Sequence, residues 1–445
     1  MGDSDPSGAF AERFDAAVER LGMAGRRVLV AFSGGLDSTL LLHALHRSDL
    51  IGEIAACHVD HGLNVESADW SARCAEVAGK LGVDFVARRV AVAPGPGQSL
   101  EAVAREARYA VLAELVRPGG IVATAHHADD QLETVLLRLL RGTGVRGLAA
   151  IRDSVPLGEG RLVRPLLGVS RAEIEAEARR LGLSWVEDPS NADTRFDRNF
   201  LRARVLPAVR ERWPAAGFAA SRLARQMAEA ETVLGEVAAA DLAVADELEC
   251  IPVDLLLPLS EPRQNNALRH ALRALGLPVP SSRQLGELRR ALDARDDAAV
   301  VVSWPGAEAR IFRRRLYLGT PAGGQPPEFG RVDASLVFRF AQGELRLVSA
   351  DGYGIPDRWA RSGLEVGFRR GGERFRPRGS RHHKTLKHWF QEAGIVPWMR
   401  STVPLLYHDD ELVAVADICL ADGLPQSAAD APFWRPVWSG HPRLR

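Results

Sequence analysis

The sequence feature that most restricts the fold is an apolar run that leads directly into a glycine-containing loop and then into a helical pattern. Residues 28–32 (VLVAF) are short and apolar, as in a buried strand, and residues 39–45 (TLLLHAL) read as helix. The loop between them consists of Ser33, Gly34, Gly35, Leu36, Asp37 and Ser38. A strand that passes through a tight loop into a helix predicts a sheet with helices packed on it, so we expect an α/β domain.

The same alternation continues downstream. Further short apolar runs occur at residues 54–59, 85–92 and 121–125, with amphipathic stretches between them. In one such stretch Leu100, Val103, Ala107 and Val111 recur at the three-and-four spacing of a helix. Repetition of strand and helix predicts a parallel, Rossmann-like sheet with helices on both faces.

The chain is long enough for several domains, because 445 residues exceed what one hydrophobic core usually supports. We predict an α/β domain over residues 1–215 and a mainly helical connecting domain over 216–320, where Leu223, Met227 and Ala230 begin a helical pattern. Strand-like pieces occur at 299–303 and 309–318, and a Gly- and Pro-rich linker follows at 319–327. Residues 331–445 contain short strand-like runs and one helical stretch at 385–392, which predicts a small α+β domain.

The composition excludes several classes of protein. Hydrophobic residues make up 46% and charged residues 26% of the chain, as in a soluble globular protein. No apolar run approaches the roughly 18 residues of a membrane span, and the N-terminus lacks a signal pattern. The four cysteines are far apart and have no metal or redox spacing, which fits inert thiols in a reducing cytosol. We therefore expect a cytoplasmic protein that has no membrane partner.

The loop has the chemistry of a phosphate site. Two adjacent glycines let backbone N–H groups approach a phosphate, the following helix N-terminus favours an anion, and Ser33 and Ser38 can donate hydroxyl hydrogen bonds. Asp37 would repel a polyphosphate unless Mg²⁺ lay between them, so we expect a metal at Asp37. The alternative is a glycine turn in which Ser and Asp cap the helix. The Gly-Lys-Ser ending of a Walker loop is absent, which disfavours transfer of the terminal phosphate.

Polar residues also follow the second and fourth apolar runs, at the strand ends where ligands of open α/β sheets bind. His58 and Asp60 end the second run and are expected to flank the nucleotide, although both could instead satisfy a turn. After the fourth run, Asp130 and Glu133 share one face of a predicted helix. Two carboxylates there could hold an ammonium group, bind a metal or accept a proton, whereas helix capping by Asp129 or Asp130 is the structural alternative. His126 and His127 lack the HExxH arrangement of a zinc site.

The formal net charge is zero, but basic residues form local groups. Between residues 369 and 388, eight arginines and lysines face a single glutamate. Such groups can bind RNA phosphates, although an exposed charged run is often only a solvated face. The residues that we expect to contact RNA are Arg141, Arg198, Arg376, Arg378, Arg381, Lys384 and Lys387.

Seven motifs together resemble one family. They are SGGLDS (33–38), HVDHGL (58–63), ARxxRY (104–109), TAHHADDQLET (124–134), RPLL (164–167), EDPSN (187–191) and RNxxR (198–202). Their identity and order resemble the tRNA(Ile)-lysidine synthetases, members of the PP-loop ATP pyrophosphatase superfamily. The match covers residues 28–207, and the downstream domains resemble the long form of that family. One departure is Asp60, where many members have Asn.

The resemblance implies an activity and residue roles. ATP, with Mg²⁺, would adenylate the wobble cytidine of an isoleucine tRNA with a CAU anticodon, and the ε-amine of free L-lysine would then displace AMP. Asp130 and Glu133 would bind lysine and remove its proton, while Arg202 and Arg105 would balance phosphate charge. The two downstream domains would bind tRNA. A homodimer is compatible with the sequence, which does not fix the oligomeric state.

Three alternatives remain open at this point. A tRNA thiolase of the same superfamily would need paired cysteines or an iron–sulfur cluster. A glutamine-dependent amidotransferase would need an attached amidase segment with a nucleophilic cysteine, and none is evident. A non-catalytic protein that binds adenine nucleotide or RNA on the same fold would have no chemical need for Asp130 and Glu133.

Overall fold

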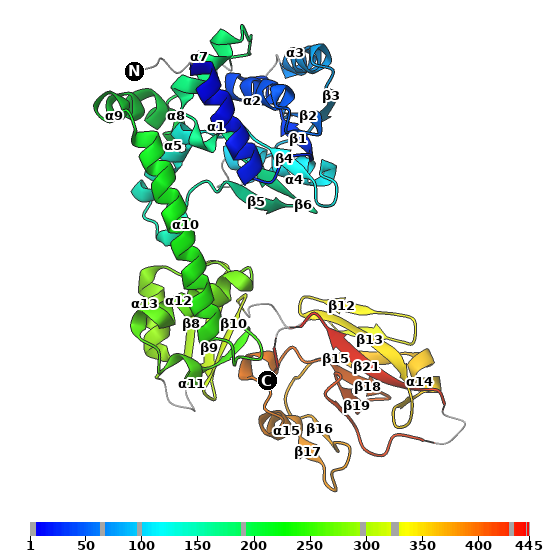
Figure 1. Cartoon of the computed structure of the whole chain (residues 1–445). Helices are drawn as coiled ribbons and strands as arrows, with labels where there is room; N and C mark the ends of the chain where they lie inside the picture. Colours follow the sequence, from blue (N-terminus) through cyan, green and yellow to red (C-terminus); the bar gives the residue numbers. More distant parts are fainter. Residues whose placement is uncertain are drawn as a thin grey trace. The chain divides into compact units, whose positions relative to one another are not determined.

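The computed structural model describes residues 6–62, 67–95, 100–187, 193–293, 300–321, 329–426, 431–441 and 443–444. The chain divides into two compact units, Met1–Val233 and Leu234–Arg445, which are described separately (Figure 1). Among the described helices, none is both long and apolar enough to cross a membrane.

The first unit is built on a six-stranded sheet in the order β3-β2-β1-β4-β6-β5. The strands are β1 (Arg27–Ala31), β2 (Glu53–Asp60), β3 (Asp84–Arg89), β4 (Ile121–Ala123), β5 (Ser154–Leu157) and β6 (Gly160–Val163). All neighbours pair in parallel except β5, which is antiparallel to β6. The four predicted strands and their parallel pairing are confirmed, and the β5–β6 hairpin is an addition.

Helices cover both faces of this sheet, as predicted. Because side chains alternate along a strand, Val28 and Val30 of β1 face one core, and Leu29 and Ala31 pack against the other. The first core is closed by α1 (Pro6–Arg20), α2 (Leu36–Arg47), α3 (Ser67–Lys80) and α7 (Arg171–Arg180). The second is closed by α4 (Leu100–Leu115), whose Leu112 is fully buried.

A further group of helices follows the carboxyl end of β4. These are α5 (Ala128–Leu140), α6 (Val145–Leu148), the 3₁₀ turn η1 (Pro165–Gly168), α8 (Asp197–Phe200), the π-helical turn η3 (Leu201–Val205), α9 (Leu206–Arg212) and α10 (Ala216–Asp241). Leu132 and Val135 of α5 pack against Leu206 of α9 and Ala220 of α10. This small core fixes α5 against the segment that carries the RNxxR motif.

The second unit begins with helices packed on an antiparallel sheet in the order β7-β10-β9-β8. Its elements are β7 (Cys250–Pro252), α11 (Val253–Leu256), α12 (Glu261–Ala274), α13 (Ser282–Ala291), β8 (Val300–Trp304), β9 (Ala307–Phe312) and β10 (Arg315–Gly319). Leu272 and Leu288 from the helices meet Ile311 and Leu316 from the sheet. The strand-like piece at 309–318 is in fact a hairpin, because Arg313 and Arg314 turn the chain at positive φ.

The remainder is a mainly antiparallel β structure with short helices, in agreement with the predicted α+β class. One sheet contains β11 (Gly330–Val332), β15 (Leu364–Gly367), β18 (Leu405–His408), β19 (Glu411–Val415) and β20 (Cys419–Leu420), and another contains β12 (Phe338–Phe340), β13 (Gly343–Ala350), β14 (Ile355–Pro356) and β21 (Phe433–Ser439). The other elements are α14 (Asp357–Ser362), β16 (Arg374–Phe375), β17 (Lys384–Thr385), α15 (Leu386–Glu392) and the 3₁₀ turn η4 (Pro397–Met399).

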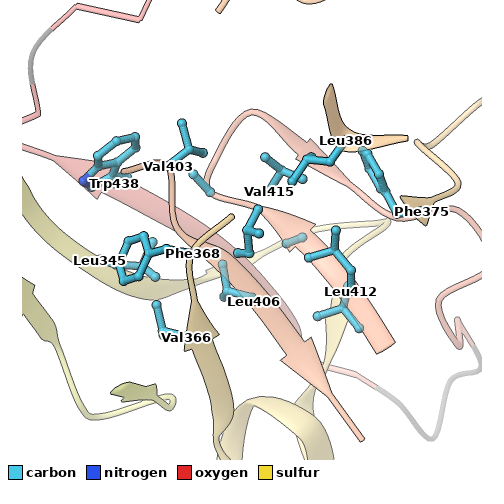
Figure 2. Close-up of a cluster of buried hydrophobic side chains, with 14 of the residues drawn as sticks. Leu345, Val366, Phe368, Phe375, Leu386, Val403, Leu406, Leu412, Val415 and Trp438 are labelled. Carbon is cyan, nitrogen blue, oxygen red and sulfur yellow. The ribbon is translucent and has the colours of Figure 1, made fainter. Parts of the chain in front are cut away.

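The core of this part lies between the two larger sheets. Leu345 and Trp438 from one sheet meet Val366, Leu406 and Val415 from the other (Figure 2). Most of the predicted linker at 319–327 lies outside the described residues, and the bounds of the three predicted domains remain predictions.

Candidate active site

The loop between β1 and α2 is open to an anion. Gly34 has a φ of +80°, and a Cβ there would lie 2.8 Å from Cys74 Sγ, so only glycine fits. Gly35 is the N-cap of α2 and no side chain caps the helix, which leaves its first N–H groups for a ligand. The hydroxyl oxygens of Ser33 and Ser38 lie 3.0 Å apart beside this helix end. The loop therefore has the glycine geometry and the donors that the sequence predicted.

Asp37 lies on the first turn of α2 and is held by an arginine. Its two carboxylate oxygens accept hydrogen bonds from Arg171 Nη1 at 2.6 and 2.7 Å. Among the described residues, no group of three or more His, Cys, Asp or Glu could hold a metal by itself. Mg²⁺ is commonly bound by one or two carboxylates together with substrate phosphates and water. Asp37 fits that mode, because it lies at the helix end where phosphates are expected.

The two predicted residues of the second strand are engaged with nearby backbone. His58 is buried, and its Nδ1 lies 3.0 Å from the carbonyl oxygen of Phe32, the residue before the loop. Asp60 accepts a hydrogen bond from the Gly62 N–H at 2.8 Å and lies 3.7 Å from Arg89 Nε. These contacts are the ones expected if both residues only satisfy backbone groups of a turn. A role toward the nucleotide stays a prediction for both residues.

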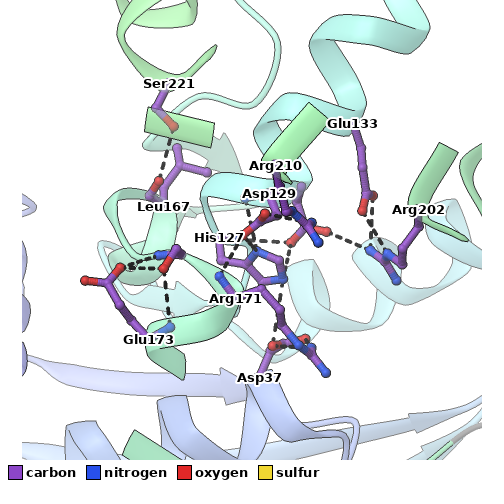
Figure 3. Close-up of polar contacts among 12 residues, drawn as sticks. Asp37, His127, Asp129, Glu133, Leu167, Arg171, Glu173, Arg202, Arg210 and Ser221 are labelled. Carbon is purple, nitrogen blue, oxygen red and sulfur yellow. Dashed lines mark hydrogen bonds and ion pairs between the residues drawn. The ribbon is translucent and has the colours of Figure 1, made fainter. Parts of the chain in front are cut away.

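The start of α5 connects the loop to the predicted carboxylates. His127 is the N-cap, and its Nδ1 accepts a hydrogen bond from the Asp129 N–H, which places the ring proton on Nε2. This Nε2 lies 3.8 Å from Asp37 Oδ1 and 3.4 Å from Asp130 Oδ2. Asp130 Oδ2 also accepts the His127 backbone N–H, so capping is part of its role. His127 thus lies between the loop and Asp130. Figure 3 shows the His127 ring above Asp37 of the loop.

Asp130 and Glu133 do not face open solvent, because two arginines of the RNxxR motif cover them. Arg198 donates from Nε to Glu133 at 2.8 Å and from Nη2 to Asp130 at 3.0 Å. Arg202 donates from Nε to Glu133 at 2.7 Å and from Nη2 to Asp130 at 3.1 Å. The Glu133 side chain is 1% exposed. We call these four residues the carboxylate–arginine cluster (Figure 3 labels Glu133 and Arg202).

The charge state of the cluster follows from its surroundings. Burial acts to raise the pKa of Asp130, but its electrostatic interactions with His127, Arg198, His126 and Arg202 outweigh burial and hold the pKa at about 2. Burial lowers the pKa of His126 to about 3. At neutral pH Asp130 is therefore ionised and His126 is neutral. A carboxylate of such low pKa binds a cation well and is a weak proton acceptor.

Several residues predicted to bind phosphate or RNA already have partners. The guanidinium group of Arg105 lies over the Tyr109 ring at 4.9 Å, and Arg141 pairs with Asp197 at 2.7 Å. In the second unit, Arg376 pairs with Asp422 at 2.9 Å and Lys384 with Glu392 at 2.6 Å.

Three more of the predicted RNA contacts lie at the surface. The Arg378 guanidinium group lies over the Tyr353 ring at 4.2 Å, and Arg381 and Lys387 are exposed. Arg198 belongs to the carboxylate–arginine cluster and is only one quarter exposed. Of the EDPSN motif only Glu187 lies within the described residues.

Comparison with known proteins assigns the family. Residues 6–209 match the model of the PP-loop domain, residues 252–317 that of the TilS substrate binding domain, and residues 364–438 that of the TilS substrate C-terminal domain. The chain is 44% identical over 397 residues to a tRNA(Ile)-lysidine synthase of Alkalilimnicola ehrlichii, covering 87% of this chain and 89% of that protein. The chain belongs to the tRNA(Ile)-lysidine synthase family.

Two other lysidine synthases agree with this assignment. The one from Coxiella burnetii is 38% identical, with 88% of this chain and 89% of that protein covered, and the one from Pseudomonas aeruginosa is 40% identical, with 92% of each covered. The family-model match to a PP-loop domain implies ATP binding.

The structure also bears on the thiolase alternative, which the comparisons do not favour. All four cysteines are free, and burial raises the pKa of Cys57 to about 11 and that of Cys74 to about 12. Thiols with such pKa values are poor nucleophiles at neutral pH. These two cysteines fit the inert thiols that the sequence predicts.

The sequence patterns assign no role to two residues at this site. They are His127, which lies between Asp37 and Asp130, and Arg171, which pairs with Asp37. A capping box at Ser170 and Glu173 marks the start of α7 in the sequence. No local pattern indicates that Arg171 reaches Asp37 across 134 residues.

Proposed function

We propose that this chain joins free L-lysine to carbon 2 of the wobble cytidine in isoleucine tRNA with a CAU anticodon. The cytidine oxygen O2 attacks the α-phosphate of ATP and pyrophosphate leaves. The lysine ε-ammonium group first gives up one proton to solvent, and the neutral amine attacks carbon 2. AMP leaves with that oxygen, and the nitrogen of the new C–N bond gives up a second proton. The observation that carries the proposal is the position of His127, which links an anion-binding loop to a buried pair of carboxylates.

The loop residues and Asp37 are proposed to bind the triphosphate. Ser33, Gly34, Gly35, Leu36 and Ser38 offer hydroxyl and backbone donors at the start of α2, and Asp37 would contribute an oxygen to Mg²⁺. When bound, this ion would neutralise phosphate charge. His58 and Asp60 would shape the nucleotide edge of the site, since both lie at the end of β2.

The carboxylate–arginine cluster is proposed to bind lysine. A lysine ammonium group needs negative oxygens, and Asp130 is ionised throughout the neutral range. Both carboxylates are paired with Arg198 and Arg202, so lysine must replace part of those contacts. The arginines would then turn toward the phosphates or the RNA, and Arg202 together with Arg105 would balance negative charge there. Because its pKa is low, Asp130 orients the amine more effectively than it removes a proton.

The tRNA is proposed to contact basic residues of both units. Arg141 in the first unit and Arg376, Arg378, Arg381, Lys384 and Lys387 in the second are the candidates, and three of these already pair with a carboxylate. On tRNA binding, each of these three basic side chains would leave its carboxylate partner and bind a phosphate. A homodimer and a cytoplasmic location remain predictions.

The decisive experiment is mass analysis of the wobble nucleoside after incubation of an unmodified CAU transcript with enzyme, ATP, Mg²⁺ and lysine. We expect cytidine to gain the mass of lysine minus water, in amounts matched by AMP and pyrophosphate. Nucleotide consumption without this product would refute the proposal.

The lysine-binding role has its own test. Asp130→Asn should raise the KM for lysine at least tenfold, because the amide lacks the negative charge that holds the ammonium group. Asp197→Asn is a matched control, since Asp197 pairs with Arg141 at the surface. A near wild-type rate for Asp130→Asn at subsaturating lysine would exclude the role.

A further inference from the structure

The segment that carries Arg198 has a second, outward-facing side. Phe196 and Phe200 stand one helical turn apart, joined by the hydrogen bond from the Phe200 N–H to the Phe196 carbonyl at 2.9 Å. Arg198, between them, points the other way and contacts Asp130 and Glu133. Phe196 and Phe200 are 45% and 49% exposed, although a phenylalanine in a folded chain is ordinarily buried. The two rings therefore lie on the opposite side of α8 from the carboxylate–arginine cluster.

The surroundings of the two rings are apolar and basic. Arg141 at the end of α5 pairs with Asp197 of α8, so the end of α5 lies beside α8. Leu140, the neighbour of Arg141, is 74% exposed. Arg204, one turn beyond Phe200, is also exposed. Exposed aromatic rings among arginines are the usual composition of a surface that binds single-stranded nucleic acid.

We propose that Phe196 and Phe200 form a stacking platform for the unpaired bases next to the cytidine that is modified. The proposal rests on the proposed function and adds the residues that hold the anticodon loop open. A cytidine must leave the base stack before its carbon 2 can be reached, and its neighbours then lose stacking partners. The rings of Phe196, the N-cap of α8, and Phe200, its last residue, supply replacements on either side of Arg198, which contacts Asp130 and Glu133. Arg141 and Arg204 would neutralise the adjoining phosphates.

RNA fits this surface better than a protein partner does. A stable protein interface would need a larger exposed apolar area, whereas here two rings and the end of α5 expose only a few apolar side chains and lie near Arg141 and Arg204. The rings are continuous with the site through Arg198, so a base stacked on them stays close to the reacting cytidine.

The test compares the double variant Phe196→Ala/Phe200→Ala with wild type. Loss of one base–aromatic stack typically weakens single-strand binding by roughly fivefold to a hundredfold. We expect the KM and Kd for the CAU transcript to rise at least fivefold, while the KM for ATP and lysine at saturating tRNA stays within twofold. A second double variant that combines Phe196→Ala with Phe200→Trp should bind the CAU transcript more tightly than Phe196→Ala/Phe200→Ala does. Leu223→Ala on α10, which also removes an exposed apolar side chain, is the control.

A second measurement identifies the partner of the rings. The RNA probe is an anticodon stem-loop with an abasic residue in place of the base beside the wobble cytidine. Its affinity for wild type should be as low as the affinity of the normal stem-loop for the double variant. The double variant should not distinguish the two RNAs. The proposal would be overturned if the abasic residue lowered the RNA affinity of both proteins equally. It would also be overturned if Phe200→Leu restored RNA binding fully and Phe200→Trp did not. Lysidine formation by wild type is measured separately, so failure of the platform and failure of the proposed function give different results.

Discussion

Replacement of Asp130 by asparagine tests the electrostatics of the site. The pKa of Asp130 is about 2, against 3.8 for an unperturbed aspartate, and each unit of difference corresponds to about 1.4 kcal/mol. The ionised carboxylate should therefore contribute about 2–3 kcal/mol to the free energy of unfolding at pH 7. Asparagine keeps an oxygen that can accept the His127 N–H, so the loss reports mainly the missing charge.

The contribution of Asp130 to stability should depend on pH in a defined direction. Because the pKa is lower in the folded state, the contribution of Asp130 is fully present above about pH 4 and is lost as the pH falls toward 2. We would measure the free energy of unfolding of wild type and Asp130→Asn in urea, through hydrogen exchange of peptides from α5 to α9. The difference between the two proteins should stay constant from pH 7 to pH 5 and become smaller below pH 4. Asp197→Asn should cost less than about 1 kcal/mol throughout, since its pair with Arg141 is exposed.

Two results would refute this reasoning. Equal stability of wild type and Asp130→Asn at pH 7 would mean that the burial of Asp130 is not compensated by the arginines. If the difference in unfolding free energy became smaller between pH 7 and pH 5, the carboxyl group of Asp130 would have a raised pKa, as expected of a general base.

Three further outcomes are expected. Asp37→Ala should raise the Mg²⁺ concentration needed for half-maximal pyrophosphate release at least fivefold without changing tRNA affinity, and an unchanged Mg²⁺ dependence would exclude a metal role. Gly34→Ala should destabilise the protein by about 1–2 kcal/mol in thermal unfolding and weaken ATP binding, because φ is +80° and Cys74 blocks the new Cβ; wild-type stability would show that the loop can rearrange. Replacing Arg376, Arg378 and Arg381 together with alanine should weaken tRNA binding and lower its salt dependence by about two to three in the log–log slope. If the affinity is unchanged at every salt concentration, the RNA-binding role of these arginines is wrong.

Much of the fold was predictable because its signals are local. The strands β1 to β4 are short apolar runs, and the patterns that begin at Leu100 and Leu223 correspond to α4 and α10. The misses have local causes too. Strands β5 (SVPL) and β6 (GRLV) contain serine, proline, glycine and arginine, so neither is a continuous apolar run, and the turn at Arg313 and Arg314 lacks the glycine or asparagine that usually marks positive φ.

The site was predictable only in part. Asp130 and Glu133 are three residues apart on one helix, so their common face follows from helical geometry. Their partners Arg198 and Arg202 lie 65 to 72 residues away, and their pairing depends on how α8 and η3 pack beside α5. The predicted RNA contact at Arg198 could not be separated from this role, because sequence spacing does not state which way a side chain points.

The sequence by itself determined the glycine loop after β1, the parallel sheet and the family, because these depend on glycine conformation, hydrophobic period and motif order. Only the tertiary structure decided the electrostatic state of the site. It placed His127 between Asp37 and Asp130, covered both carboxylates with arginines and turned Phe196 and Phe200 outward. The physical reason is that charge interactions and burial depend on distances between segments far apart in the chain, which packing alone sets.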